Sequence, residues 1–319
     1  MILAKKEKRE GLKRRFCKSA DSRQSSERGV IVSKKALPKK PLTKRRLKNL
    51  ILNVVKNPFN MIVLISLIIL FCLIIIPLLT MIATTFTAGQ AELRRIGDGA
   101  QVGDFTLYYW QYMLASNMSK AVLWEPLLNS LIIGVFVVII SVPLGSVLAW
   151  LMVRTDIPGK KILSMLVIIP YMIPSWTKAL SWLAVFRNST SGANGFLAGL
   201  GLPIPDWLAY GPIAIILCMS MHYYAFSYIM VSGSLRSINS ELEEMGEIQG
   251  ASKPQILRYI TLPLILPSIL SAVIMTISKS IGTYGVAANL GNRIGYYTLA
   301  TKMRVYIEQG PQGVGYAMS

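Results

Sequence analysis

Long apolar runs, separated by shorter polar segments, make up most of this chain after a strongly charged beginning. Five of the runs reach roughly the 20 residues that a helix needs to cross the hydrocarbon core of a bilayer. They predict membrane-spanning helices over Met61–Ile82, Leu128–Val153, Ile162–Phe186, Ile213–Val231 and Leu264–Gly285. The pattern therefore predicts an all-α integral membrane protein, built as a multi-span helical bundle.

Positive charge is concentrated before the first apolar run. The formal net charge is +19, and 19 of the 34 Lys and Arg residues precede Phe59, against four acidic residues. A basic segment directly before a first span is typical of a cytoplasmic N-terminus, and the short basic loop Arg154–Lys161 is predicted on the same side. This topology places residues 84–127 and 187–211 outside the cell and residues 232–263 in the cytoplasm. Nucleic-acid binding is disfavoured, because the basic segment has few aromatic side chains for stacking on bases.

The chain before the first span divides into two predicted parts. Residues 1–41 are charged and aperiodic, which indicates a disordered cytoplasmic tail. Residues 42–57 carry apolar side chains at helical spacing opposite basic ones, which predicts an amphipathic helix in the lipid headgroup layer. A simple polar lead-in to the first span is the alternative. Residues 58–319 form the predicted membrane domain, in the plasma membrane.

The polar segment 240–263, between the fourth and fifth predicted spans, contains signals for the start and end of a helix. Ser240 and Glu243 have the spacing of a capping box, so a helix is predicted to begin at Glu241. Gly250 is placed to end this helix in a left-handed conformation.

A second capping-box spacing follows, from Ser252 to Gln255, and predicts another short helix. The dipeptide Leu262-Pro263 is predicted to turn the chain into the fifth span. Two short helices joined at a glycine form a compact projection, which either docks a partner or packs back on the bundle.

The same segment resembles the signature of permease subunits from binding-protein-dependent ABC importers. That signature has a glutamate, a glycine six residues later and a downstream Ile-x-Leu-Pro. The matching residues here are Glu244, Gly250, Ala251, Ile260, Leu262 and Pro263. The resemblance implies that they form a coupling segment that docks on a cytoplasmic ATPase dimer. Met245, Gly246 and Glu247 depart from the alanines usual in the family.

The resemblance extends over roughly residues 60–319. Within this range, the chain is similar to the family's iron(III)-type branch in residues 128–151, 154–160, 282–291, 297–302 and 310–313. It implies a bundle of the type I importer kind, a second permease half and an extracytoplasmic binding protein. The implied solute is iron(III), and the two span lysines described below predict an anionic or chelated small solute. Thr283 stands where many relatives have an acid. Because such relatives are often double length, the chain is expected to be a first half, with a sixth span beyond its C-terminus.

Two lysines fall within predicted spans, Lys178 in the third and Lys279 in the fifth, and neither span contains an acidic residue. A lysine at the bilayer centre costs about 3 kcal/mol on insertion scales, so such side chains usually face a cavity or a partner. With His222 and Tyr284 they are the candidate residues of a solute path. The alternatives are lysines that extend to the interface and a histidine that is only packed or hydrogen-bonded.

Enzymatic motifs are missing from the sequence. It has no phosphate-binding loop and no His-Glu-x-x-His zinc motif, and its single histidine cannot build a Ser/His/Asp arrangement. No catalytic residue, metal site or cofactor is therefore expected, and ATP hydrolysis is assigned to a separate partner. The competing interpretation is a secondary transporter or channel that works without an ATPase.

Overall fold

The computed structural model describes residues 58–90, 92–96, 99–188, 192, 194–239 and 241–319. The predicted tail (1–41), the predicted amphipathic helix (42–57) and the predicted capping residue Ser240 lie outside the described residues. By its internal contacts the chain divides into two units, Met1–Leu73 and Ile74–Ser319.

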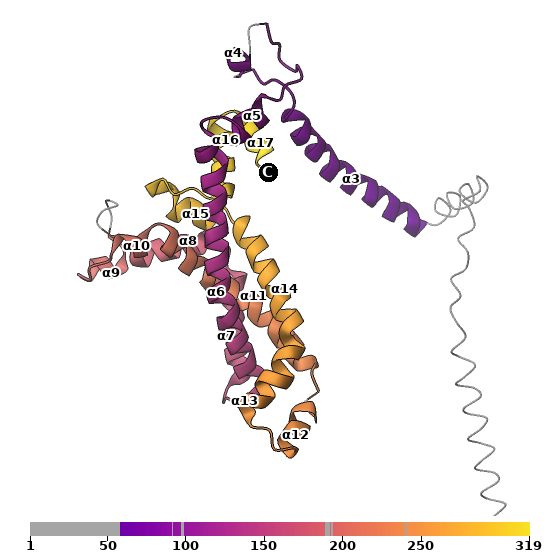
Figure 1. Ribbon diagram of the computed structural model, residues 1–319, viewed down its shortest axis with the longest axis vertical. Helices are drawn as coiled ribbons and strands as arrows, with labels where there is room; N and C mark the ends of the chain where they lie inside the picture. The colour runs from indigo at the N-terminus through magenta and orange to yellow at the C-terminus, as the bar shows by residue number, and fades with distance from the viewer. Residues whose placement is uncertain (1–57, 91, 97–98, 189–191, 193, 240) are drawn as a thin grey trace, which may run out of the picture. The chain divides into compact units, whose positions relative to one another are not determined.

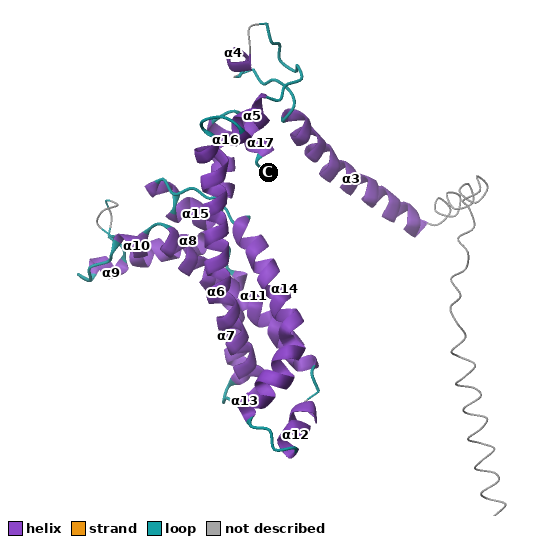
Figure 2. Cartoon of the chain, in the orientation of Figure 1, coloured by secondary structure: helices purple, strands orange, loops and turns teal. Residues whose placement is uncertain are grey.

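The regular secondary structure of the described residues is helical (Figures 1 and 2), apart from one isolated antiparallel bridge between Thr87 and Phe105. Its helices, in chain order, are α3 (Pro58–Thr84), α4 (Leu93–Ile96), α5 (Tyr108–Leu114), η1 (Lys120–Trp124), α6 (Glu125–Arg154), α7 (Lys160–Met172), α8 (Ser175–Phe186), α9 (Phe196–Gly199), α10 (Asp206–Ala209), α11 (Pro212–Ser237), α12 (Glu241–Ile248), α13 (Lys253–Ile256), η3 (Leu257–Thr261), α14 (Leu262–Ile281), α15 (Gly285–Leu290), η4 (Asn292–Ile294), α16 (Leu299–Gln309) and α17 (Gln312–Ala317).

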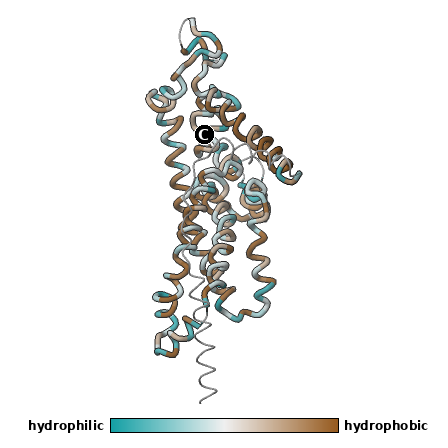
Figure 3. The backbone as a smooth tube through the Cα atoms, turned by 90° about the vertical axis from the view of Figure 1, so that its right-hand side faces the viewer, coloured by the Kyte–Doolittle hydropathy of each residue, from teal (hydrophilic) through white to brown (hydrophobic). Residues whose placement is uncertain are grey.

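Four helical stretches among the described residues are long and apolar enough to cross a membrane. They are Pro58–Thr84, Lys120–Arg154, Asp206–Ser237 and Lys253–Ile281. Hydrophobic residues dominate these long helices in Figure 3. These stretches contain the predicted first, second and fourth spans and nearly all of the fifth, which ends at Ile281 instead of Gly285.

The predicted third span, Ile162–Phe186, is not one continuous helix. It consists of α7 and α8, which meet at an angle of 97° across a short break. Pro174 lies at this break and has no N–H to donate to the carbonyl of Pro170, four residues earlier, so the α-helical hydrogen bonds cannot continue. The pair is a broken span or a re-entrant segment, and it raises the number of spans from four to five if it counts as one.

Small residues allow α6 and α11 to pack closely along their lengths. A Cβ atom at Gly145 of α6 would lie 2.4 Å from the carbonyl oxygen of Tyr224 and 2.7 Å from Cβ of Ser227 on α11. Ala149, one turn further along α6, is fully buried. Close backbone approach at small residues is the usual way in which helices associate inside a membrane, where water does not drive them together. α14 packs against both of these helices and completes the bundle.

At one end of the bundle, the segments before α6 and after α15 pack together. Tyr109 and Met113 of α5, Val122 of η1, and Val314 and Met318 at the C-terminal side form one buried cluster. Both segments therefore lie at the same end of the bundle.

At the opposite end of the bundle, the segment from Glu241 to Thr261 differs from its prediction in one respect. The second short helix, α13, does not end before the fifth span. It continues through the π-helix η3 into α14, so Lys253–Ile281 is one helical stretch. Leu262 and Pro263 therefore lie inside this stretch and make no turn. Pro263 fits there because it lies in the first turn of α14, directly after the π-helical turn, where a missing N–H does not interrupt a regular α-helical ladder.

Candidate functional site

The predicted stop of α12 at Gly250 is confirmed. Gly250 has a φ of +83°, which a residue with a Cβ adopts only with strain. Its N–H donates to the carbonyl of Glu247 (2.9 Å), and the N–H of Ala251 donates to the carbonyl of Gly246 (3.0 Å). These two bonds are the pair of the Schellman motif, which satisfies the last carbonyls of a helix.

The helix starts on either side of this glycine are fixed by side chains. The N–H of Ser252 donates to Oε1 of Gln255 (2.8 Å), which confirms the second predicted capping box. At the start of α12, Oδ1 of Asn239 accepts a bond from the N–H of Glu241 (3.2 Å), and its amide donates to Oε2 of Glu241 (2.8 Å). Sequence reasoning missed Asn239, although asparagine is a favoured residue before a helix.

Gly246 explains how α12 packs against the next helix. It is buried, and a Cβ at this position would lie 3.0 Å from Cδ1 of Ile260 and 3.3 Å from Cγ1 of Ile256. The departure from the family's alanine thus brings α12 close to α13 and η3. Ile260, one of the signature residues, contributes to this internal contact.

The opposite side of α12 is exposed. Glu244 and Gly250 are exposed, as are the large apolar side chains of Met245 (57%) and Ile248 (85%). A hollow of about 420 Å³ lies between the Gly246 side of α12 and the next helices, and Gly250, Ala251 and Tyr259 also line it. Apolar side chains exposed on a polar projection are characteristic of a surface that binds another protein.

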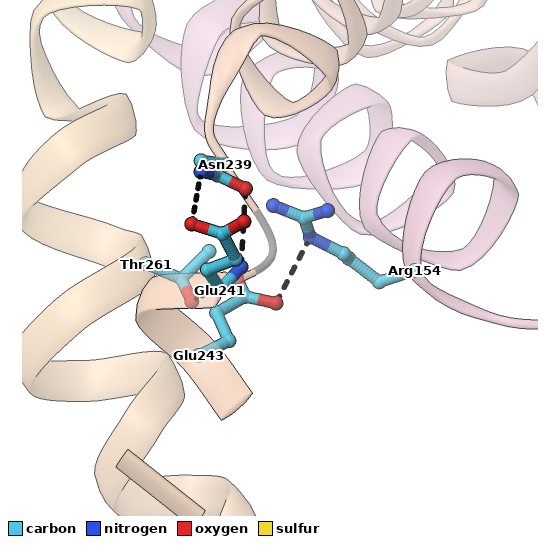
Figure 4. A network of polar contacts seen from close by, with 5 residues as sticks. All are labelled: Arg154, Asn239, Glu241, Glu243 and Thr261. Carbon is cyan, nitrogen blue, oxygen red and sulfur yellow. Dashed lines mark hydrogen bonds and ion pairs between the residues drawn. The ribbon is translucent and has the colours of Figure 1, made fainter. Parts of the chain in front are cut away.

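Glu243, which faces inward, connects three elements (Figure 4). Its Oε2 lies 3.2 Å from Nε of Arg154, the last residue of α6. Its Oε1 accepts a hydrogen bond from the hydroxyl of Thr261 in η3 (2.8 Å). We call these three residues the Glu243 clamp. The sequence marked Glu243 only as a capping partner, because nothing local indicates a contact with a residue almost ninety positions away.

A second polar site lies at the break between α7 and α8. A cavity of about 390 Å³ is lined by residues of three helical regions, namely Tyr171, Met172, Ile173, Pro174, Ser175, His222, Tyr223 and Lys279. The ring of Tyr171 stacks on His222, with the ring centroids 5.3 Å apart. Two of the four candidate path residues, His222 and Lys279, therefore line one cavity.

Lys178 lies beside this cavity and supports the broken span. Its ammonium donates to the carbonyl of Pro170, the group that Pro174 leaves without a helical donor, and it also contacts Nδ1 of His222. The lysine thus satisfies a backbone group that would otherwise be unpaired inside the membrane.

Lys279 occupies the far wall of the cavity. The hydroxyl of Tyr223 donates to the backbone carbonyl of Lys279 (3.1 Å) and bonds Thr283 (2.7 Å), while the Lys279 ammonium lies 5.8 Å from the ring centroid of Phe226. Tyr284, the fourth candidate, does not line this cavity, and its ring lies under the guanidinium of Arg304. Sequence reasoning missed Tyr171 and Tyr223.

Several known proteins are similar to this chain. The sulfate transport system permease protein CysT of Salmonella typhimurium is 24% identical over 205 residues, which cover 61% of this chain and 72% of that protein. The molybdenum transport system permease protein ModB of Escherichia coli K12 is 26% identical over 175 residues, 54% of this chain and 73% of that protein. The galactooligosaccharides transport system permease protein GanP of Bacillus subtilis is 25% identical over 232 residues, which cover 69% of this chain and 53% of that protein. The iron(III) branch implied by the resemblance gains no support from these relatives.

The fold is similar to that of a bacterial ABC transporter involved in the import of the acidic polysaccharide alginate. The TM-score is 0.60 at 19% identity, and the match covers 85% of this chain and 91% of that one. The model of one family, described as the inner membrane component of binding-protein-dependent transport systems, matches residues 141–317. The chain therefore belongs to this family, as a membrane-spanning transport subunit whose ATP hydrolysis is performed by a separate component.

Proposed function

We propose that the chain is a permease subunit of an ATP-driven importer for a small oxyanion such as sulfate or molybdate. A binding protein outside the membrane delivers the solute, and a second permease half completes the path. A cytoplasmic ATPase pair docks on α12. The observation that carries the docking is the exposed face of α12, on which Glu244, Met245 and Ile248 are available for contact.

Charge and the Glu243 clamp support a cytoplasmic position for α12. The loop between α6 and α7 is basic, which favours the cytoplasm. Arg154 at the edge of this loop contacts Glu243, so α12 lies at the same end of the bundle. The same charge rule favours a cytoplasmic N-terminus. ATP is available on that side, as an ATPase partner requires.

The solute class is supported by the cavity at the α7–α8 break. Lys279 lines it and Lys178 lies beside it, whereas α7, α8, α11 and α14 contain no acidic residue. A positively charged cavity without carboxylates attracts anions and repels free metal cations. The names of the sulfate and molybdenum relatives agree with an oxyanion.

Uptake by the complete transporter in membrane vesicles tests the proposal. We expect ATP-dependent accumulation of labelled sulfate or of molybdate, and no accumulation of a neutral galactooligosaccharide. Accumulation of the oligosaccharide alone would overturn the solute class. Accumulation by this chain without any ATPase would overturn the importer assignment in favour of a secondary transporter or channel.

A further inference from the structure

We propose that Glu243 is a positioning residue for coupling: it ties α12 to the ends of two spans, so that movement of α12 reaches α6 and α14 together. This inference rests on the proposed function, because it assumes that an ATPase moves α12. It concerns a different residue and a different face from the docking surface.

The link to α14 runs through η3. α12 packs on α13 and η3, which continue without a break into α14. Thr261, which donates its hydroxyl to Glu243, is the last residue of η3 and is 2% exposed. A π-helical turn interrupts the regular α-helical hydrogen bonding and is frequent at functional sites. The hydrogen bond therefore fixes α12 to the π-helical base of α14.

The link to α6 is the ion pair. Arg154 ends a helix of 30 residues, which packs along α11 and α14. A movement of Arg154 therefore acts on one end of α6, a long helix that packs against two others. Without the Glu243 carboxylate, the described polar connection between α12 and α6 is lost.

Burial distinguishes this ion pair from an ordinary surface pair. The side chains of Arg154 and Glu243 are 16% and 20% exposed. Removing one partner leaves the other charge largely buried and uncompensated, a costly state. Asp156 and Lys160, at the same end of the bundle, form an ion pair of similar length (3.1 Å) with side chains that are 103% and 44% exposed. An exposed pair of this kind contributes little, so Asp156 offers a matched control.

The two neighbouring glutamates separate coupling from docking. Glu244 is exposed on the outer face, whereas Glu243 faces the spans. Glu243→Gln keeps the size of the side chain and leaves the outer face unchanged. It should therefore remove the ion pair with Arg154 without removing the surface that an ATPase would contact.

The test uses the complete transporter in proteoliposomes, with two readouts. One is the amount of ATPase that co-purifies with the chain. The other is the stimulation of ATP hydrolysis by the binding protein, loaded with whichever of sulfate, molybdate and galactooligosaccharide stimulates the wild type most. We expect Glu243→Gln and Arg154→Met each to retain the ATPase but to lose stimulation about fivefold or more, the range of typical coupling energies. Asp156→Asn should match the wild type in both readouts.

Two combined variants show whether the residues act as a unit. The double variant Glu243→Gln with Arg154→Met should be no worse than either single variant, because both remove the same interaction. The charge-reversed pair Glu243→Arg with Arg154→Glu should recover part of the stimulation, which a general loss of folding would not allow.

Three outcomes would overturn the inference. Loss of the ATPase from Glu243→Gln would make Glu243 a docking residue. Unchanged stimulation would show that the connection is not used, and no recovery in the charge-reversed pair would show that the pairing itself is unimportant. A wild-type chain that retained no ATPase would overturn the proposed function and the inference with it, whereas the other results overturn the inference alone.

Discussion

The α12–α13 segment and the cavity at the α7–α8 break use polar groups in opposite ways. In the segment, caps and the Glu243 clamp bind the polar groups internally, and the apolar side chains of Met245 and Ile248 are left exposed. At the break, apolar helices surround a cavity that Lys279 and His222 line. The first arrangement suits a folded protein partner, and the second suits a small charged solute. The same chain thus has one surface suited to a protein and one cavity suited to a small charged solute.

The largest expected effect comes from Gly250→Val, which disrupts the end of α12 in the α12–α13 segment. A β-branched residue at a φ of +83° stores strain of about 1–3 kcal/mol, so the end of α12 should rearrange. We expect co-purification of the ATPase to be lost. Gly159→Val, with the same kind of strain at φ +75° before α7, should retain it. Equal retention in both variants would contradict the role of the α12 end in docking.

Lys279→Met tests the cavity side. A hydrogen bond to a charged group is worth about 1.5–3 kcal/mol, so loss of this ammonium should reduce uptake of sulfate or molybdate about tenfold or more. Lys302→Met on α16 also removes a lysine, but outside the cavity, and should leave uptake nearly unchanged. If the two variants behave alike, Lys279 does not contact the solute. Retention of the ATPase should be normal in both.

Lys178→Met tests whether this lysine stabilises the α7–α8 break or contacts the solute. Methionine cannot donate to the carbonyl of Pro170, and a buried unpaired carbonyl costs about 1–3 kcal/mol. We expect a lower Tm of the detergent-purified protein, measured by thermal unfolding, with a smaller loss of uptake per folded molecule than for Lys279→Met. An unchanged Tm would show that Lys178 does not support the break.

Gly246→Ala should have the smallest effect. The added Cβ would meet Ile260 at 3.0 Å, but that atom is the end of a flexible side chain that can shift. We expect ATPase retention within about twofold of the wild type, because the Ile260 side chain can move aside and the outer face of α12 stays unchanged. Gly246→Leu should reduce it strongly. Complete loss with alanine would mean that the spacing of α12 and α13 tolerates no adjustment.

The sequence predicted the features that depend on local signals. The Gly250 stop, the Ser252 capping box and four spans follow from residue types within a few positions of one another, and the structure contains them. Pro170 and Pro174 mark Ile162–Phe186 as a candidate for a kink or a broken helix, but hydropathy averaged over a span does not predict the size of the bend, which is 97°.

Long-range partners could not be predicted. His222 and Lys279 meet only because α11 and α14 pack against the break, and Glu243 meets Arg154 only because α12 folds back on the end of α6. Each of these contacts depends on helix packing, for which a single sequence contains no pairwise signal. Tyr284 was chosen from the resemblance to the family and lies against Arg304 instead.

The Glu243 clamp also limits how this protein can be recombined with its relatives. A chimera that takes only α12 and Gly250 from this chain would contain Glu243, which needs an arginine at the end of the recipient's second span to form its ion pair. Such a graft would present the correct outer face to an ATPase while lacking its inner attachment. The unit to exchange is therefore three separate pieces of sequence: the end of α6, α12, and η3.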